Sequence, residues 1–221
     1  MYRVLHTVVP PLAKVVWRPT VRGLHRIPDR GPVILASNHL SFADSVVIPI
    51  VVPRKVVFLA KSDYFTGTGL KGSLSRAWFS GLGMLPVDRD DTAAAMQSLD
   101  TALGVLARGE AFGIYPEGTR SRDGRLYRGR TGVVRLALAT GSPVVPVGLV
   151  GVDEIQPIEA SVPKVRSFTA TFDEPFDVTS FVQSLHAGES AEVQNRAVLH
   201  PRRDDLRAAT DEIMRRIQSI T

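Results

Sequence analysis

The sequence predicts an α/β domain with a mainly parallel sheet flanked by helices on both faces, preceded by an N-terminal amphipathic membrane-associating segment. Short, compact apolar runs alternate with helical patterns along the chain, and such alternation favours parallel strands joined by crossover helices. The 221 residues, 44% of them hydrophobic, suffice for one domain with a sizeable core. We therefore divide the chain into the membrane-associating segment (1–22), the domain (23–182), and a surface loop with a C-terminal closing helix (183–221).

The strands are predicted from apolar runs bounded by turn residues. Residues 33–36 and 56–60 are short and almost entirely apolar, which is typical of buried strands, and a helix should follow each. Residues 112–115 and 144–147 have the same character. Residues 166–172 alternate between polar and apolar side chains, which indicates a later strand at the edge of the sheet.

The helices are predicted from apolar spacing and from their end signals. A helix should begin at residue 91 or 92 and extend to about residue 108, where Gly109 ends it. Residues 131–140 are helical in pattern, with Gly141 as the stop. From residue 204 onward, apolar side chains at helical spacing predict the closing helix, whereas the poorly apolar residues 183–203 favour a surface loop.

The composition limits the chemistry and the partners. The chain has no cysteine, which excludes disulfides, thiolate metal sites and a cysteine nucleophile. Its net charge of +5 suggests an anionic partner: nucleic acid, an acidic membrane or a phosphorylated substrate. Residues 115–135 hold six arginines, two carboxylates and no lysine, and guanidinium groups favour bidentate phosphate binding. Only Tyr127 offers an aromatic platform within the loop, so we predict no nucleic-acid partner.

The first 22 residues combine apolar side chains, a tryptophan and a few cations. No run of the chain reaches the roughly 18 apolar residues of a spanning helix, and Pro10 and Pro11 interrupt the segment, with no small-residue cleavage site after it. A short basic amphipathic stretch suits an anchor at an anionic membrane surface. We therefore predict a peripheral protein at the cytoplasmic face of the membrane. The alternative is a helix packed on the domain.

The first group of candidate site residues, 38–44, follows the first predicted strand directly. His39 and Asp44 meet if the histidine lies in the loop and the aspartate in the first turn of the next helix. Asp44 would then fix one ring nitrogen and leave the other free as a general base. The alternative is structural, because Ser41 and Asp44 also have the spacing of a helix capping box, and Asn38 and His39 suit a turn.

The second group, residues 115–121, leaves a predicted strand through Pro116 and Gly118 and opens the arginine-rich loop. Glycine allows the backbone to approach a ligand closely. The alternative is a solvated basic loop without a ligand. Taken together, the two groups place a possible base and a phosphate-binding loop at the carboxyl ends of strands, where open parallel sheets bind ligands.

These motifs resemble the 1-acylglycerol-3-phosphate (lysophosphatidate) acyltransferase family within the glycerolipid acyltransferase superfamily. Its members share four short blocks in fixed order, and the first and third are the specific ones. In this chain the blocks correspond to residues 38–44, 83–89, 116–121 and 144–147. Two departures stand out: Pro86 replaces an aromatic or β-branched residue beside Arg89, and Tyr115 replaces a common phenylalanine, a change that can add a hydrogen bond.

The resemblance implies a role for each matching residue. His39 would act as general base, with Asp44 orienting it, while Arg89 and Arg120 would bind the substrate phosphate. Direct transfer is favoured, since the chain has neither a cysteine nor a Gly-x-Ser-x-Gly elbow to hold an acyl intermediate. No metal and no organic cofactor are required. The remaining matching residues would shape the site: Asn38, Ser41, Glu117, Gly118, Thr119 and Pro146.

The implied reaction transfers a fatty acyl group from acyl-CoA or acyl carrier protein to the free hydroxyl of 1-acylglycerol-3-phosphate, giving phosphatidic acid. The expected partners are thus an acyl thioester, a lysophospholipid acceptor and an anionic membrane surface. A glycerol-3-phosphate or other lysophospholipid acyltransferase remains open, as does a non-catalytic module that binds anionic lipid. The sequence leaves open the acyl chain length, the donor carrier, the position acylated, the exact acceptor and the oligomeric state.

Overall fold

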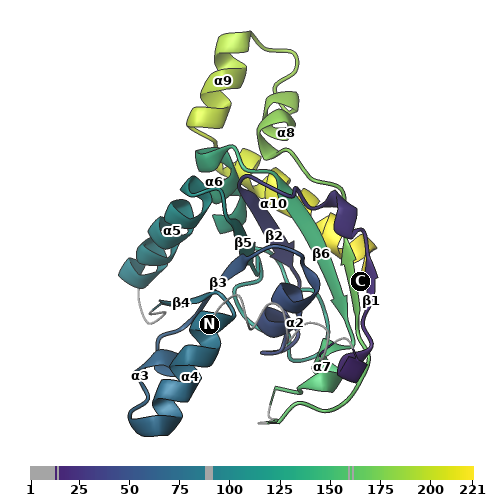
Figure 1. The fold of residues 1–221 in the computed structure, drawn as a ribbon. Helices are drawn as coiled ribbons and strands as arrows, with labels where there is room; N and C mark the ends of the chain where they lie inside the picture. Colours follow the sequence, from purple (N-terminus) through teal and green to yellow (C-terminus); the bar gives the residue numbers. More distant parts are fainter. Residues whose placement is uncertain (1–12, 14, 88–91, 159, 161) are drawn as a thin grey trace.

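The protein folds around a seven-stranded sheet of order β1-β7-β6-β2-β5-β3-β4 (Figure 1). The computed structural model describes residues 13, 15–87, 92–158, 160 and 162–221. Neighbouring strands are parallel except for the antiparallel pair β6 and β7, which confirms the predicted mainly parallel sheet. The strands are β1 (Thr20–Arg22), β2 (Val33–Ser37), β3 (Val56–Lys61), β4 (Met84–Val87), β5 (Ala111–Ile114), β6 (Val144–Val150) and β7 (Thr169–Phe172).

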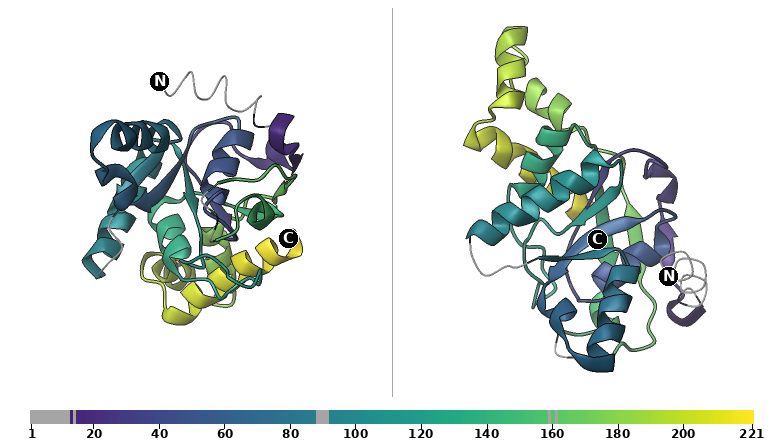
Figure 2. Two further views of the ribbon diagram at one scale, coloured as in Figure 1. Left: turned by 90° about the horizontal axis from the view of Figure 1, so that it is seen from below. Right: turned by 60° about the vertical axis from the view of Figure 1, so that its left-hand side comes forward.

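Helices cover both faces of the sheet, as predicted (Figures 1 and 2). Two apolar clusters result: one lies beneath α2, α4 and α7, and the other beneath α5, α6, α8 and α10. A short 3₁₀ helix, η1 (Leu24–Arg26), follows β1. The α-helices are α2 (Asp44–Val51), α3 (Asp63–Thr66), α4 (Gly69–Gly81), α5 (Thr92–Ala107), α6 (Gly132–Thr140), α7 (Val152–Ile155), α8 (Val178–Ser184), α9 (Ala191–Leu199) and α10 (Arg203–Ser219).

The predicted central elements are confirmed within one or two residues at most ends. β2, β3, β5 and β6 are the expected buried strands, and α5, α6 and α10 the expected helices. Gly109 and Gly141 both follow their helices with positive φ, the left-handed conformation that glycine adopts without strain. β2 lies beside β5 and parallel to it, so the loops that follow these two strands meet at the carboxyl ends of the strands.

The strand predicted at the edge is not an edge strand. β7 lies between β1 and β6, because Thr20–Arg22 adds to its open side in parallel register. The actual edges are β1 and β4. β1 is three residues long and belongs to the stretch that the sequence assigned to the membrane-associating segment. The folded domain therefore begins before residue 23.

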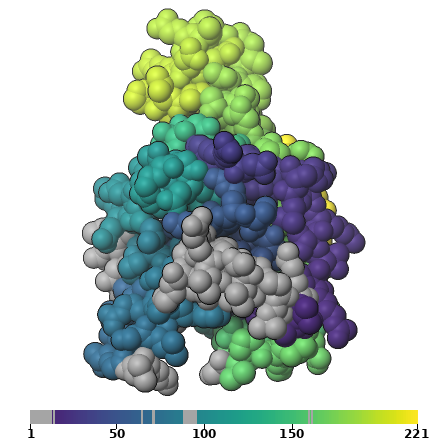
Figure 3. Space-filling view, in the orientation of Figure 1, coloured from purple at the N-terminus to yellow at the C-terminus, as the bar shows by residue number. Residues whose placement is uncertain are grey.

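The prediction of a surface loop over residues 183–203 is wrong, because this stretch contains the end of α8 and all of α9. The two helices stand out from the body of the molecule as a hairpin (Figure 3). α9 buries only Ala197, and a helix with so narrow a contact needs few apolar residues to form. Low apolar content was therefore a poor guide to its structure.

The N-terminal segment is described only in part, since residues 1–12 and 14 lie outside the described residues. Ala13 is buried, and Trp17 packs against the core and donates from Nε1 to the Lys164 carbonyl at 3.2 Å. Val15, by contrast, is 72% exposed. Within the described residues, no helix combines the length and apolar character needed to cross a membrane.

Candidate active site

Asn38 fixes the start of the site by extending the pairing of β2 with β6. Its side-chain amide donates to the Leu149 carbonyl at 2.9 Å and accepts from the Leu149 N–H at 2.8 Å. The buried amide thus replaces one backbone unit of the ladder, just where β2 ends. The position of the next residue, His39, is set by this strand pairing.

His39 and Asp44 form a hydrogen-bonded pair at the carboxyl end of β2. The Nδ1 atom of His39 lies 2.8 Å from Oδ2 of Asp44, whose carboxylate is fully buried, while the His39 side chain remains 13% exposed. Oδ2 also accepts from the N–H groups of Leu40 and Ser41, at 2.7 and 2.8 Å. Because Oδ2 acts as an acceptor in these contacts, the proton of its hydrogen bond with His39 must lie on Nδ1. In the neutral ring, Nε2 is then the nitrogen that can accept a proton.

The two interpretations of the first motif are compatible in the structure. Asp44 is the first residue of α2, and by accepting from the Ser41 N–H it performs half of a capping box. The Ser41 hydroxyl does not complete the box; it donates to the Gln156 carbonyl at 2.6 Å. One carboxylate therefore both shapes the loop before α2 and holds the imidazole.

Burial raises the pKa of the two site carboxylates. Desolvation raises the pKa of Asp44 above its usual value, while the hydrogen bonds from His39, Ser41 and Leu40 oppose this. Desolvation likewise raises the pKa of Glu117, opposed by backbone N–H groups of Tyr127 and His39. In both cases the donors favour the ionised form, and in Asp44 the negative charge lies directly beside the imidazole.

Glu117 acts as a clamp between the two motifs. Its Oε1 accepts from the His39 N–H at 2.9 Å and its Oε2 from the Tyr127 N–H at 2.8 Å. A further hydrogen bond joins the two motifs, because the Ser121 N–H donates to the His39 carbonyl at 2.7 Å. The buried carboxylate is thus occupied with backbone donors, which makes it a shaping residue for the loops around His39.

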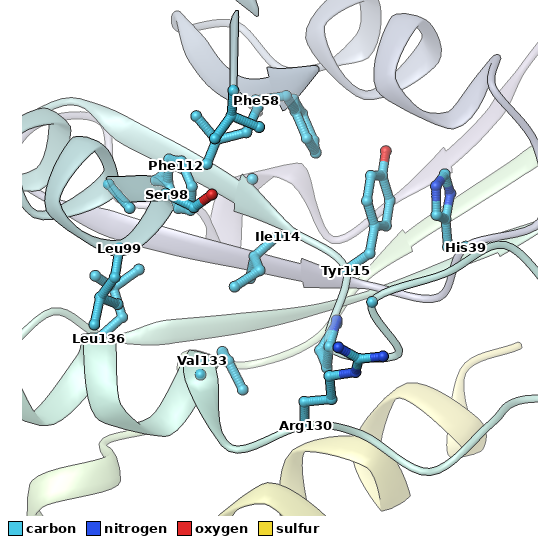
Figure 4. A pocket seen from close by; sticks show the side chains of 17 residues that line it. His39, Phe58, Ser98, Leu99, Phe112, Ile114, Tyr115, Arg130, Val133 and Leu136 are labelled. Atoms are coloured by element: carbon cyan, nitrogen blue, oxygen red, sulfur yellow. The ribbon is translucent and has the colours of Figure 1, made fainter. Parts of the chain in front are cut away.

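An apolar cavity of about 470 Å³ extends from His39 into the space between the sheet and helices α5 and α6 (Figure 4). His39 and Tyr115 line one end, while the rest of the wall is mostly apolar. Gly113 also lines it: a Cβ at this position would lie 2.1 Å from the ring of Phe58, so only glycine leaves room for that ring. The apolar lining includes Phe58, Leu99, Phe112, Ile114, Val133 and Leu136.

Arg130 was not singled out from the sequence, yet it lines the same cavity as His39. Its guanidinium lies against the backbone of Gly118, where a Cβ would come within 2.9 Å of Nε. The backbone N–H of Arg130 donates to the Pro116 carbonyl at 2.7 Å. Nothing in the sequence distinguishes Arg130 from the other five arginines of the loop, because the fold alone selects the one that reaches the cavity.

The other site residues predicted from the sequence are more dispersed. Arg120 is half-buried directly before Ser121, makes no ion pair with a described residue, and is not among the residues that line the cavity. Thr119 is exposed. Pro146 is buried within β6, opposite Ala36, and does not line the cavity either. Arg89 lies outside the described residues.

This arrangement suits proton transfer beside an apolar ligand. The imidazole of His39 is oriented by a buried carboxylate and retains one nitrogen that bonds to no described residue, which is the geometry of a general base. The adjoining cavity accommodates an apolar chain, and Arg130 supplies a cation at its wall. Among the described residues, no group of three or more histidine or carboxylate side chains could hold a metal ion.

Comparisons with known proteins agree with this chemistry. The 1-acyl-sn-glycerol-3-phosphate acyltransferase of Brassica napus chloroplasts is 30% identical over 142 residues, which are 64% of this chain and 40% of that protein. Human 1-acyl-sn-glycerol-3-phosphate acyltransferase alpha is 30% identical over 132 residues, 59% of this chain and 44% of that protein. The matches thus span less than half the length of these two relatives.

Structure and family comparisons extend the likeness. The crystal structure of the 1-acyl-sn-glycerophosphate acyltransferase from Thermotoga maritima superposes with a TM-score of 0.68 at 20% identity, covering 100% of this chain and 82% of that one, which shows a shared fold. The acyltransferase family model matches residues 18–150, more than half of the chain, including His39, Asp44 and Glu117. The chain therefore belongs to the acyltransferase family.

Proposed function

We propose that this protein transfers a fatty acyl group from acyl-CoA or acyl carrier protein to the free hydroxyl of 1-acylglycerol-3-phosphate, producing phosphatidic acid. The observation that carries the proposal is the His39–Asp44 pair at one end of an apolar cavity. The names of the relatives support the same acceptor. No cofactor is needed, because the thioester is itself the activated acyl group.

In the proposed reaction, Nε2 of His39 accepts the proton of the acceptor hydroxyl as that oxygen attacks the thioester carbonyl. A new C–O bond forms, and the tetrahedral intermediate then breaks its C–S bond. The imidazolium returns the proton to the departing thiolate, so the base is regenerated. The buried carboxylate of Asp44, 2.8 Å from Nδ1, holds the imidazole in place and stabilises its transient positive charge.

The apolar cavity is the proposed site of the donor's acyl chain. A chain placed between Leu99 of α5, Ile114 of β5 and Val133 of α6 would be removed from water, which is favourable in proportion to its apolar area. Because His39 lines the same cavity, the thioester carbonyl would remain beside the base. The wall thus favours a long acyl chain over a short, polar donor.

Arginines are the proposed ligands of the acceptor phosphate. Arg120 is the family-matched candidate within the described residues, and it is free of ion pairs there. Arg89 is the other, although it lies outside the described residues. A phosphate monoester offers three oxygens and nearly two charges to guanidinium forks, more than a diester does. The proposal therefore favours lysophosphatidate over acceptors with a capped phosphate.

Peripheral attachment to the cytoplasmic face of an anionic membrane is also proposed. Support comes from exposed Val15, beside the half-buried Trp17, at the end of the basic N-terminal segment. Sedimentation with anionic vesicles should be weaker for a chain lacking residues 1–12, which retains the packed Ala13 and Trp17. Equal sedimentation of the two chains would contradict the proposal.

The acceptor is tested by comparing kcat/KM for lysophosphatidate, glycerol-3-phosphate and lysophosphatidylcholine, with one long-chain acyl-CoA and detection of the free thiol. Lysophosphatidate should give the highest value. A higher kcat/KM for glycerol-3-phosphate would indicate a glycerol-3-phosphate acyltransferase instead. A higher kcat/KM for lysophosphatidylcholine would contradict the proposal that arginines bind a phosphate monoester. If no acceptor causes thiol release, either with acyl-CoA or when the assay is repeated with an acylated carrier protein as donor, a non-catalytic lipid-binding module would be favoured.

The phosphate ligand is tested by Arg120→Lys, with Arg128→Lys as the matched control from the same loop. Lysine keeps the charge and loses the bidentate geometry, so Arg120→Lys should raise the KM for lysophosphatidate several-fold. The control exchanges the same groups at an exposed residue outside the family-matched residues 116–121 and should leave KM unchanged. Equal effects in both variants would show that only the general charge of the loop matters.

A further inference from the structure

The ring of Tyr115 lies flat against the imidazole of His39. The two ring centroids are 3.8 Å apart and the planes differ by only 8° (Figure 4). On its other side Tyr115 is stacked near Phe58, with centroids 5.5 Å apart. Its hydroxyl lies 2.9 Å from the Ser45 hydroxyl, and these two groups share a hydrogen bond. Tyr115 is therefore held at both its face and its tip.

We propose that Tyr115 is a positioning residue for His39, which fixes the plane of the imidazole while Ser45 fixes Tyr115 in turn. The inference rests on the proposed role of His39 as general base. The resemblance assigns no role to this contact, and phenylalanine is common in the family at position 115, directly before Pro116. The hydrogen bond that tyrosine can add over phenylalanine has its partner in Ser45.

A hydrogen bond at one ring nitrogen leaves the plane of an imidazole incompletely defined. Asp44 restrains the position of Nδ1, yet the ring can still turn about the line from Nδ1 to the carboxylate. A second ring stacked at 3.8 Å blocks this turn. Because Nε2 lies off the axis of this turn, the turn would tilt its lone pair away from a bound hydroxyl. Orientation of this kind strongly affects proton transfer.

The first turn of α2 carries both restraints. Asp44 holds the edge of the imidazole, and the next residue, Ser45, holds the tyrosine that covers its face. The helix start thus links the loop after β2, which carries His39, to the end of β5, which precedes Tyr115. This explains why a polar residue at position 45 is useful inside a helix whose other residues are mostly apolar.

The stack also affects the charged form of the base. A cation within about 6 Å of an aromatic face is stabilised by the ring, so Tyr115 favours the imidazolium that forms during transfer. The other charged or titratable groups around His39 are the carboxylates of Asp44 and Glu117 and the guanidinium of Arg130. All three remain in place when Tyr115 alone is changed.

The test compares Tyr115→Leu, Tyr115→Phe and Ser45→Ala by kcat and by the KM values for donor and acceptor. Tyr115→Leu should lower kcat about tenfold or more with little change in either KM. Tyr115→Phe and Ser45→Ala should each cost less than about threefold. The double variant should cost no more than either, because both remove one shared hydrogen bond.

Phe79→Leu is the matched control for lost packing. Phe79 belongs to the same core cluster and packs against Phe42 and Phe65, and it does not line the cavity beside His39. It should lower thermal stability without changing kcat per folded molecule. If Tyr115→Leu behaves like this control, with kcat per folded molecule unchanged, the positioning role is overturned.

A readout without turnover separates this inference from the proposed function. In the wild type, the NMR signals of the His39 ring protons should be shifted upfield by the stacked tyrosine, with His39→Ala identifying them. Tyr115→Leu should abolish that shift, and Tyr115→Phe should retain it. Unshifted signals in the wild type would contradict the stack even if acyl transfer is observed, while absence of acyl transfer with shifted signals would contradict only the proposed function.

Discussion

His39 and His186 both lie against carboxylates, and the difference between them separates a candidate base from a structural ion. His39 uses one ring nitrogen, which faces Asp44 at 2.8 Å. His186 uses both: Nδ1 lies 3.3 Å from Glu189 and Nε2 lies 3.1 Å from Asp205. A histidine between two carboxylates must carry a proton on each nitrogen, so it has no lone pair for a substrate.

The surroundings of the two histidines differ in the same sense. His39 lines a cavity, whereas His186 lies in the turn between α8 and α9 and connects that hairpin to the first turn of α10. The hairpin follows Phe176, which pairs with Val144 at the amino end of β6, so it lies at the opposite end of the sheet from His39. A histidine–carboxylate pair therefore indicates chemistry only where one nitrogen remains available beside a cavity.

The largest expected effect comes from removing the candidate base. His39→Ala should lower kcat by about 10²- to 10⁴-fold, the usual contribution of a positioned base. Asp44→Asn should lower kcat nearly as far, because the amide oxygen can still accept from the Leu40 and Ser41 N–H groups but no longer stabilises a charged imidazole. Steady-state kinetics and circular dichroism measure both effects; more than about a tenth of wild-type rate in His39→Ala would remove its assignment as base.

The second expected effect is a loss of stability that leaves the activity of the folded protein unchanged. His186→Leu leaves the buried Asp205 carboxylate without its ring partner, and burying an unpaired charge is unfavourable. The melting temperature should drop by several degrees while kcat per folded molecule is unchanged. The exposed His200, at the end of α9, gives the control His200→Leu. An equal change in melting temperature in both variants would show that the His186 ion pairs contribute nothing specific.

The smallest effect is a pH dependence of stability. The hydrogen bonds that His186 donates to Glu189 and then to Asp205 raise its pKa above the ordinary value of 6.5. The folded state binds this proton more tightly than the unfolded state, so the stabilisation is complete below about pH 6.5 and is lost as the pH rises through the raised pKa. Thermal melts should show a decline above pH 6.5 that is absent in His186→Leu. A parallel decline in the variant would contradict this linkage.

Much of the site was predictable because its chemistry is local in sequence. His39 and Asp44 are five residues apart, and both the turn and the helix start between them follow from local residue preferences. The strand and helix order around them was equally visible, since buried parallel strands are continuous apolar runs. Helix α9 was missed for the opposite reason, because it buries a single residue and has no strong apolar pattern.

By itself the sequence determined the α/β class and the two motifs, and it allowed a pairing of His39 with Asp44, because apolar periodicity and short spacing are properties of the chain. Only the tertiary structure decided which residues from distant segments surround His39. It brought Glu117 to the His39 backbone, Tyr115 to the imidazole face and Arg130 to the cavity. These contacts depend on strand order and loop packing, which no spacing along the chain encodes, so Arg130 could be singled out among six arginines only when the fold placed it beside the cavity.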